Sequence, residues 1–180
     1  MSHVTKGISL EDEYKKNIGI TPEDIRRLRE WLNTQPHLPK DSITDLDLIL
    51  VYHASGRSAQ VAKELLDLNY TLRTLFSSIF HNRTVDNTIE RVFNKVLYTI
   101  LPGPGKDGSA VFYGRLIDLE PKNFEFTSFI KGYMMLMDLW QWQQGSWHGF
   151  ILVFDLAGIT FGHLSRLEIL VLQQLLVYVQ

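Results

Sequence analysis

The chain lacks cysteine altogether, and its charges almost cancel. Without cysteine, its 180 residues can form neither a disulfide framework nor a thiolate metal site. A formal net charge of -2 and a pI near 6.3 provide no overall attraction for nucleic acid or for an anionic membrane. We therefore expect no cofactor, no metal and no nucleic-acid partner, and we expect any ligand to be held in a pocket.

The chain also lacks a run of 18 uncharged apolar residues, because Asp155, Arg166 and Glu168 interrupt its long apolar region. A membrane-spanning helix needs about 20 such residues, so none is expected. The opening segment, MSHVTKGISLEDEYKK, has no apolar core of the kind found in signal peptides. These two absences predict an intracellular, cytoplasmic protein, and they leave peripheral association with a membrane open.

The first strong pattern is the start signal of a helix at Thr21-Pro22. Thr21 can cap free amide groups, and Pro22 suits the first helical position. Apolar residues then recur at helical spacing, and charged residues are expected to face solvent, until Pro36 and Pro39 end the segment. The apolar positions are Ile25, Leu28, Trp31 and Leu32, and the solvent-facing ones are Arg26, Arg27, Arg29 and Glu30.

Two more helices are predicted to complete a three-helix unit. The second extends from Asp45 to Ala54 with Gly56 as its stop, and the third begins at Ser58. The third helix carries an apolar stripe that we expect to be buried. This stripe consists of Val61, Leu65, Leu68, Leu72 and Leu75. The chain is therefore divided into an N-terminal extension (1–19), a helical unit (20–83) and a second domain (84–180).

Residues 101–108, LPGPGKDG, contain the literal pattern G-x-G-x-x-G. A dinucleotide or Walker loop leads into a helix that holds phosphate, whereas this loop leads into the strand-like segment AVFYGRLI. Lys106 is followed by Asp107 instead of the Ser or Thr of a Walker loop. The loop is therefore interpreted as a turn between strands at 97–101 and 110–117. A small nucleotide-dependent enzyme is the alternative that this loop leaves open.

The rest of the second domain alternates helix and strand. A helix is expected over residues 124–141, and the apolar run FILVFD at 150–155 predicts a parallel strand buried on both faces. Asp155 is expected to act as a turn or cap residue. His163 has no second His, Asp or Glu at ligand spacing on its element, which argues against a metal or catalytic role.

Two segments of this domain carry a recognisable pattern, and they are GKDGSAVFYGRLIDLEP and GFILVFDLAGITFGHLSRLEILVLQQLLVYVQ. They resemble the CRAL-TRIO lipid-binding family, in particular its insect members named after α-tocopherol transfer protein. Residues 20–75 extend the resemblance toward the N-terminus. The most specific element is a strand followed by Asp155-Leu156-Ala157-Gly158, then Phe161-Gly162-His163 and an apolar helix.

The resemblance implies an α/β fold in which an N-terminal three-helix unit precedes a mixed or parallel CRAL-TRIO sheet with covering helices. It also implies a non-enzymatic role. Family members hold one hydrophobic molecule, such as a retinoid, a tocopherol or a phospholipid, and transfer it between membranes. Binding of phosphatidylinositol bisphosphate and transient contact with a membrane surface are implied by the same resemblance.

The lipid-binding residues are expected on the strand at 150–155 and in the segment after it. Side chains alternate along a strand, so Phe150, Leu152 and Phe154 share one face, which could form the floor of a lipid cavity. The resemblance adds three further positions that match lipid-facing positions of the family. They are Phe161, Leu167 and Val179.

The last residues, LEILVLQQLLVYVQ, form an apolar helix with no glycine stop, basic last turn or polar tail. The resemblance implies that a family member continues past residue 180 with further strands, a lid helix and the basic head-group site. We therefore expect a C-terminally truncated chain with an incomplete sheet and impaired transfer. A protein-interaction module, in which this helix meets a partner protein, is the other alternative.

Overall fold

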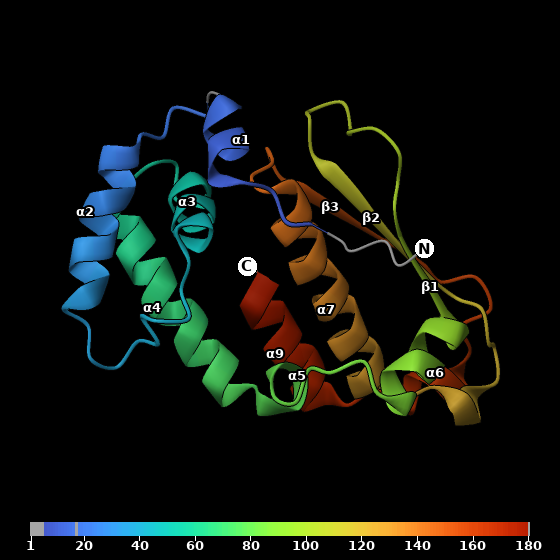
Figure 1. Cartoon of the computed structure of the whole chain (residues 1–180). Helices are drawn as coiled ribbons and strands as arrows, with labels where there is room; N and C mark the ends of the chain where they lie inside the picture. The colour runs from blue at the N-terminus through green and yellow to red at the C-terminus, as the bar shows by residue number, and fades with distance from the viewer. Residues whose placement is uncertain (1–5, 17, 180) are drawn as a thin grey trace. The chain divides into compact units, whose positions relative to one another are not determined.

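The structure is a computed structural model of the chain, and it describes residues 6–16 and 18–179 (Figure 1). The helices are α1 (Leu10–Lys15), α2 (Pro22–Asn33), α3 (Asp45–Ala54), α4 (Ala59–Leu75), α5 (Ser77–Phe80), α6 (Asn87–Lys95), α7 (Phe126–Gln144), α8 (Phe161–Leu164) and α9 (Ile169–Val179). A short 3-10 helix, η1, spans Pro121–Asn123. The strands are β1 (Val96–Ile100), β2 (Ala110–Leu116) and β3 (Phe150–Asp155).

The chain divides into two compact units. Unit 1 contains the described residues up to Leu72 together with Leu139–Ser146, and unit 2 contains Arg73–Asp138 and the described residues from Trp147 onward. Helices α4 and α7 therefore contribute residues to both units.

Unit 1 is built from helices whose starts are encoded locally. Both α2 and α3 begin with a capping box, in which Thr21 is paired with Asp24 and Thr44 with Asp47. The predicted starts of these helices are therefore confirmed, and α3 has the bounds expected from the sequence. The apolar core of unit 1 consists of Ile20, Ile25, Leu28, Leu32, Leu38, Ile43, Leu48, Ile49, Tyr52, Ala62 and Leu66.

Two sequence expectations for unit 1 are wrong. Arg29 does not simply face solvent, because its guanidinium lies 2.6 Å from the carboxylate of Asp45 at the start of α3. On α4 the buried positions are Ala62 and Leu66, whereas Val61 of the expected stripe is 41% exposed. Each buried position lies one residue after a position of the expected stripe. One residue corresponds to a rotation of about 100° around the helix axis. Helical spacing alone does not decide between two such neighbouring stripes.

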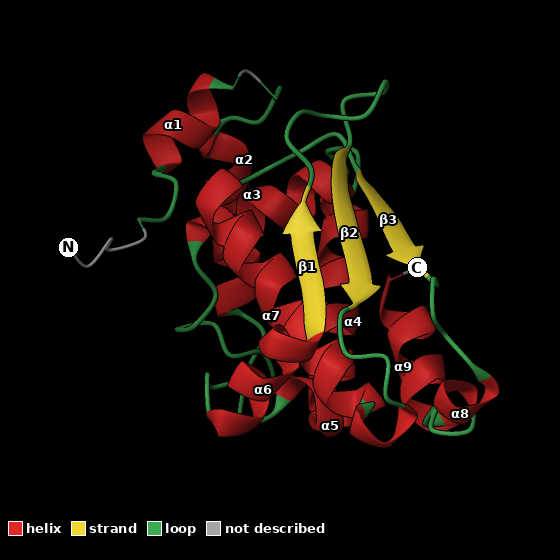
Figure 2. Cartoon of the chain, turned by 90° about the vertical axis from the view of Figure 1, so that its right-hand side faces the viewer, coloured by secondary structure: helices red, strands yellow, loops and turns green. Residues whose placement is uncertain are grey.

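Unit 2 contains a mixed three-stranded sheet, which confirms the predicted α/β fold class. β1 and β2 are antiparallel, β2 and β3 are parallel, and the strand order is β1-β2-β3. Figure 2 shows the three strands side by side with α7 behind them. A helical crossover between β2 and β3 is what a parallel connection requires.

The glycine-rich segment is a turn between β1 and β2, as the sequence predicts. Gly103 and Gly108 have positive φ angles of 88° and 85°, which favour glycine. The amide of Gly105 donates to the carbonyl of Ser109 at 2.7 Å, and the amide of Gly108 donates to the carbonyl of Gly105 at 3.0 Å. These amides are used inside the turn, which gives little support to the nucleotide alternative.

β3 is parallel to β2 as predicted, but the expectation that it is buried on both faces is wrong. Its five apolar residues, from Phe150 to Phe154, are between 37% and 49% exposed. The reason is its position at the end of the sheet, where within the described residues it pairs with β2 only. The turn role expected for Asp155 is confirmed, since its carboxylate accepts a hydrogen bond from the amide of Ala157 at 2.9 Å.

Candidate functional site

One face of the sheet in unit 2 packs against α7. The hydroxyl of Tyr98 on β1 donates to the carbonyl of Phe129 on α7 at 2.8 Å. On β2, Phe112 is only 1% exposed, and its ring centroid lies 6.3 Å from that of Tyr133 on α7. At β1 and β2 this face is therefore a closed, largely aromatic core.

The opposite face is more polar near the end of β3. The hydroxyl of Tyr113 donates to the carboxylate of Asp155 at 2.8 Å, and Arg115 lies 3.7 Å from the same carboxylate. The amide of Ala157, followed by the hydroxyl of Tyr113, lowers the pKa of Asp155. The same hydrogen bond raises the pKa of Tyr113. This face has the character of a solvated surface.

Three of the predicted lipid-binding residues lie together on the face that packs against α7. The ring of Phe150 lies 5.6 Å from the ring of Phe112, and the ring of Phe154 lies 5.6 Å from that of Tyr133. Leu152 is opposite Phe112 in the register of β2 and β3, so it shares their face. These three residues extend the aromatic core to an exposed apolar surface, which we call the β3 face.

The other three predicted residues lie on or next to later elements. Phe161 begins α8 and is 88% exposed. Leu167 lies between α8 and α9 and is partly buried, and Val179 is the last residue of α9 and is 43% exposed. Among the residues that the structure describes, no ring contact like those that join Phe150 and Phe154 to the core is found at Phe161. A common cavity for these three residues and the β3 face stays a prediction.

Tyr133 on α7 is a candidate functional residue that the sequence analysis did not single out. Its side chain is 2% exposed, and within the described residues its hydroxyl has no hydrogen-bond partner. Burial raises the pKa of Tyr133 above its ordinary value. The signal in the sequence is a residue with a polar tip on the apolar side of the helix at 124–141.

A group of charged and aromatic residues fixes α9 within unit 2. Arg73 lies 3.1 Å from Asp138 and donates to the hydroxyl of Tyr178 on α9 at 3.0 Å. Arg83 lies 2.6 Å from the same aspartate, and the rings of Phe80 and Tyr178 are 4.6 Å apart. Burial works against the charge of Arg73, yet Asp138 and Tyr178 raise the pKa of this guanidinium. The group joins residues far apart in the chain, so no local sequence pattern predicts it.

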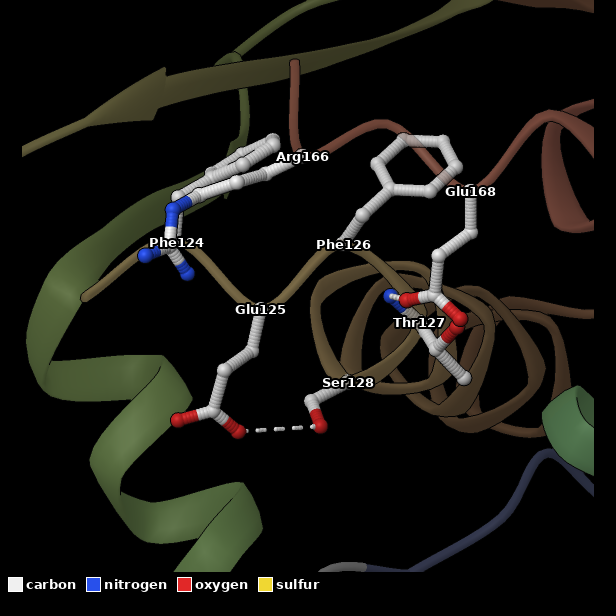
Figure 3. A pocket seen from close by; sticks show the side chains of 7 residues that line it. All are labelled: Phe124, Glu125, Phe126, Thr127, Ser128, Arg166 and Glu168. Carbon is white, nitrogen blue, oxygen red and sulfur yellow. Dashed lines mark hydrogen bonds between the residues drawn. The ribbon is translucent and has the colours of Figure 1, made fainter. Parts of the chain in front are cut away.

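A cleft of about 380 Å³ lies at the start of α7 (Figure 3). Its lining residues are Phe124, Glu125, Phe126, Thr127, Ser128, Arg166 and Glu168. The amide of Thr127 donates to Glu168 at 3.3 Å, and the hydroxyl of Ser128 donates to Glu125 at 3.4 Å. With two carboxylates and one guanidinium, this cleft is too polar to hold a hydrophobic molecule, and none of the predicted lipid-binding residues lines it.

His163 is a buried residue with a structural role. It is 1% exposed, and its Nδ1 accepts a hydrogen bond from the amide of Thr160 at 3.1 Å, at the start of α8. Over residues 6–16 and 18–179, no three His, Asp or Glu side chains are placed to hold a metal ion together. None of the helices in this part of the chain is long and apolar enough to cross a membrane.

In a comparison with known families, two parts of the sequence match known domain types. Residues 19–89 match the Pinta-like UBA domain, and residues 94–180 match the CRAL/TRIO domain. The second match contains all three strands and supports the CRAL-TRIO family for this part of the chain. No curated protein matches the chain with significance.

Proposed function

Because residues 94–180 match the CRAL/TRIO domain, we propose that the chain binds one small hydrophobic molecule and transfers it between membranes. The cargo would be of the retinoid, tocopherol or phosphoinositide class. The observation that carries the proposal is the β3 face. Phe150, Leu152 and Phe154 continue an aromatic core, yet they are 39%, 37% and 49% exposed.

An exposed apolar face of this kind favours a ligand that covers it. Burial of apolar surface contributes about 25 cal/mol per Å², so covering ~200 Å² would contribute ~5 kcal/mol before entropic losses. Apolar pockets bind in this way and need few polar contacts to orient the ligand. The proposed floor of the site is the β3 face, and Phe161, Leu167 and Val179 are proposed to approach the same ligand.

The proposal includes transient contact with a membrane surface from the cytoplasm. It is supported by Leu156 and Phe161, which follow β3 and are 69% and 88% exposed. Apolar side chains on such a segment can enter the boundary between head groups and acyl chains. The proposed role is binding and transfer, without catalysis. Similarity to the insect tocopherol-transfer-like members and binding of phosphatidylinositol bisphosphate remain predictions.

A protein-interaction module is the second candidate, and α9 favours it. Ile169 and Leu170 of this helix are 59% and 74% exposed. An amphipathic helix that shows such residues can insert them into the groove of a partner protein. A partner purified at equal stoichiometry with no bound lipid would support this function over lipid transfer.

Two neighbouring residues of β3 allow a matched test. Phe154 lies on the β3 face and Val153 on the opposite face, and they are 49% and 39% exposed. Phe154→Asp should abolish binding of the fluorescent fatty acid cis-parinaric acid, because it places a charge on the proposed floor. Val153→Asp should retain most of the binding, and Phe154→Ala should weaken it.

Circular dichroism must show that all three variants remain folded. Equal binding by folded Phe154→Asp and Val153→Asp would contradict the assignment of the β3 face as the floor of the site.

A further inference from the structure

We propose that Arg73 and Arg83 form an anion site in unit 2, at which a small oxyanion such as phosphate balances a surplus of positive charge. The site shares no residue with the β3 face, and the inference does not depend on lipid binding. Two guanidinium groups share the carboxylate of Asp138, that of Arg73 at 3.1 Å and that of Arg83 at 2.6 Å. Two positive charges and one negative charge leave a surplus of one positive charge.

The surplus charge is partly removed from water. The side chain of Arg83 is only 17% exposed, and those of Arg73 and Asp138 are each 31% exposed. The ring centroid of Phe80 lies 5.0 Å from the Cζ of Arg73 and 5.7 Å from the Cζ of Arg83. An aromatic ring attracts a cation but carries no net charge. Because a charge in such surroundings is costly without an opposite charge nearby, the group favours an anion.

The free edge of Arg83 indicates which kind of anion fits. Its Nη1 donates to Asp138 at 2.6 Å, whereas its Nε is buried and has no hydrogen-bond partner within the described residues. Nε and Nη2 form the edge of a guanidinium that can donate two parallel hydrogen bonds to one carboxylate or phosphate. Arg73 uses the same edge for Tyr178 at 3.0 Å and for Asp138 at 3.1 Å. The edge of Arg73 is therefore occupied, and that of Arg83 is open.

An oxyanion satisfies both requirements of the group. Its charge balances the surplus, and two of its oxygens can accept from Nε and Nη2 of Arg83. Chloride supplies the charge but not the pair of oxygens. Since Arg73 also holds Tyr178 on α9, an anion bound beside these two arginines should stabilise this part of unit 2. A ligand that binds only the folded chain raises its stability by mass action.

Inorganic phosphate is the probe, added in place of chloride at constant ionic strength. The midpoint of thermal unfolding should rise and saturate, by about 5–10 °C at a phosphate concentration one hundred times the Kd. Arg83→Gln removes the open edge and should lose the saturable rise. Arg91→Gln is the matched control and should keep it, because Arg91 is exposed on α6 and its Nε donates to the carbonyl of Asn87.

Arg83→Lys keeps the charge without the paired donors, so it separates the two contributions. It should bind phosphate about tenfold more weakly than the parent, as the loss of one charge-assisted hydrogen bond implies. Equal affinity of the parent and Arg83→Lys would overturn the assignment of the open edge. A rise that does not saturate and is equal in the parent and Arg83→Gln is the general effect of phosphate on proteins, and it would overturn the inference.

Vesicles of phosphatidylcholine with and without phosphatidic acid distinguish a free oxyanion from a lipid head group. Flotation of the parent, but not of Arg83→Gln, with phosphatidic acid alone would identify the oxyanion as a head group. A saturable effect of inorganic phosphate without flotation would identify it as a soluble anion. No effect in either experiment would overturn the inference and would leave lipid binding on the β3 face untouched.

Discussion

The two units of the chain treat their apolar residues differently. In unit 1, Leu32, Leu48 and Ile49 are fully buried. In unit 2, the apolar strand β3 is 37–49% exposed, and Leu170 of α9 is 74% exposed. Unit 1 closes its core with its own helices, whereas unit 2 keeps apolar surface open at the end of its sheet. This difference supports the proposal that unit 2 carries the binding surface.

Replacing a leucine by alanine should destabilise the protein much more in unit 1 than in unit 2, and this is the largest difference that we expect. Leu48→Ala should destabilise the protein by about 2–5 kcal/mol, because it leaves a cavity in a closed core. Leu152→Ala on the β3 face removes a side chain that is 37% exposed, and it should cost less than about 1.5 kcal/mol. Urea unfolding followed by circular dichroism measures both. Equal losses would mean that β3 is packed as tightly as the core of unit 1.

Removal of a buried carboxylate in unit 1 should cause the next largest loss of stability. Glu13 is 0% exposed, lies 2.8 Å from Lys16 and accepts a hydrogen bond from the amide of Ser146 at 3.0 Å. Glu13→Ala removes the carboxylate that both groups contact, although Lys16 still donates to the carbonyl of Ser146, and it should cost about 1–3 kcal/mol. Glu11→Ala is the control, because the side chain of Glu11 is 80% exposed and its pair with Lys15 contributes little. A similar urea midpoint for the two variants would contradict the structural role of Glu13.

Loss of a helix cap should have a smaller effect. Thr21→Ala removes the hydroxyl that accepts from the amide of Asp24, and it should cost about 1 kcal/mol. Hydrogen bonds from Thr21 lower the pKa of Asp24 below 3.8, so their stabilisation is present above that pH and is lost as the pH falls through the folded value. The variant should therefore show a weaker loss of stability on acidification. An acid titration identical to that of the parent would argue against the cap.

The smallest change in the free energy of unfolding is expected at Phe161 of unit 2. Phe161→Ser should change the free energy of unfolding by less than about 0.5 kcal/mol, because the side chain of Phe161 is 88% exposed. A loss above about 1 kcal/mol would reveal packing of Phe161 against the rest of the protein, which would lessen the contrast between the units.

What the sequence predicted well is encoded in short segments. The capping boxes at Thr21 and Thr44 fix the starts of α2 and α3, and the glycines and prolines of residues 101–108 encode the turn of a hairpin. The fold class follows from the order of helices and strands, and the alternation along β3 correctly placed Phe150, Leu152 and Phe154 on one face.

What the sequence could not predict depends on residues far apart in the chain. The apolar run of β3 is the same whether a strand is central or at an edge, so its exposure was missed. The pair of Arg29 with Asp45 and the contacts of Asp138 with Arg73 and Arg83 also join different elements. A tyrosine on an apolar stripe could be identified, but only packing reveals that the hydroxyl of Tyr133 has no partner in the described chain.

The most direct test of the central claim, that unit 2 binds a hydrophobic molecule on its open apolar face, is to identify what the purified protein carries. The full chain would be expressed in cells, purified without detergent, extracted with organic solvent and analysed by mass spectrometry, alongside folded Phe154→Asp. We predict about one apolar molecule per chain, and its loss from the variant. Extracts with no such molecule, together with a stoichiometric protein partner, would contradict the claim.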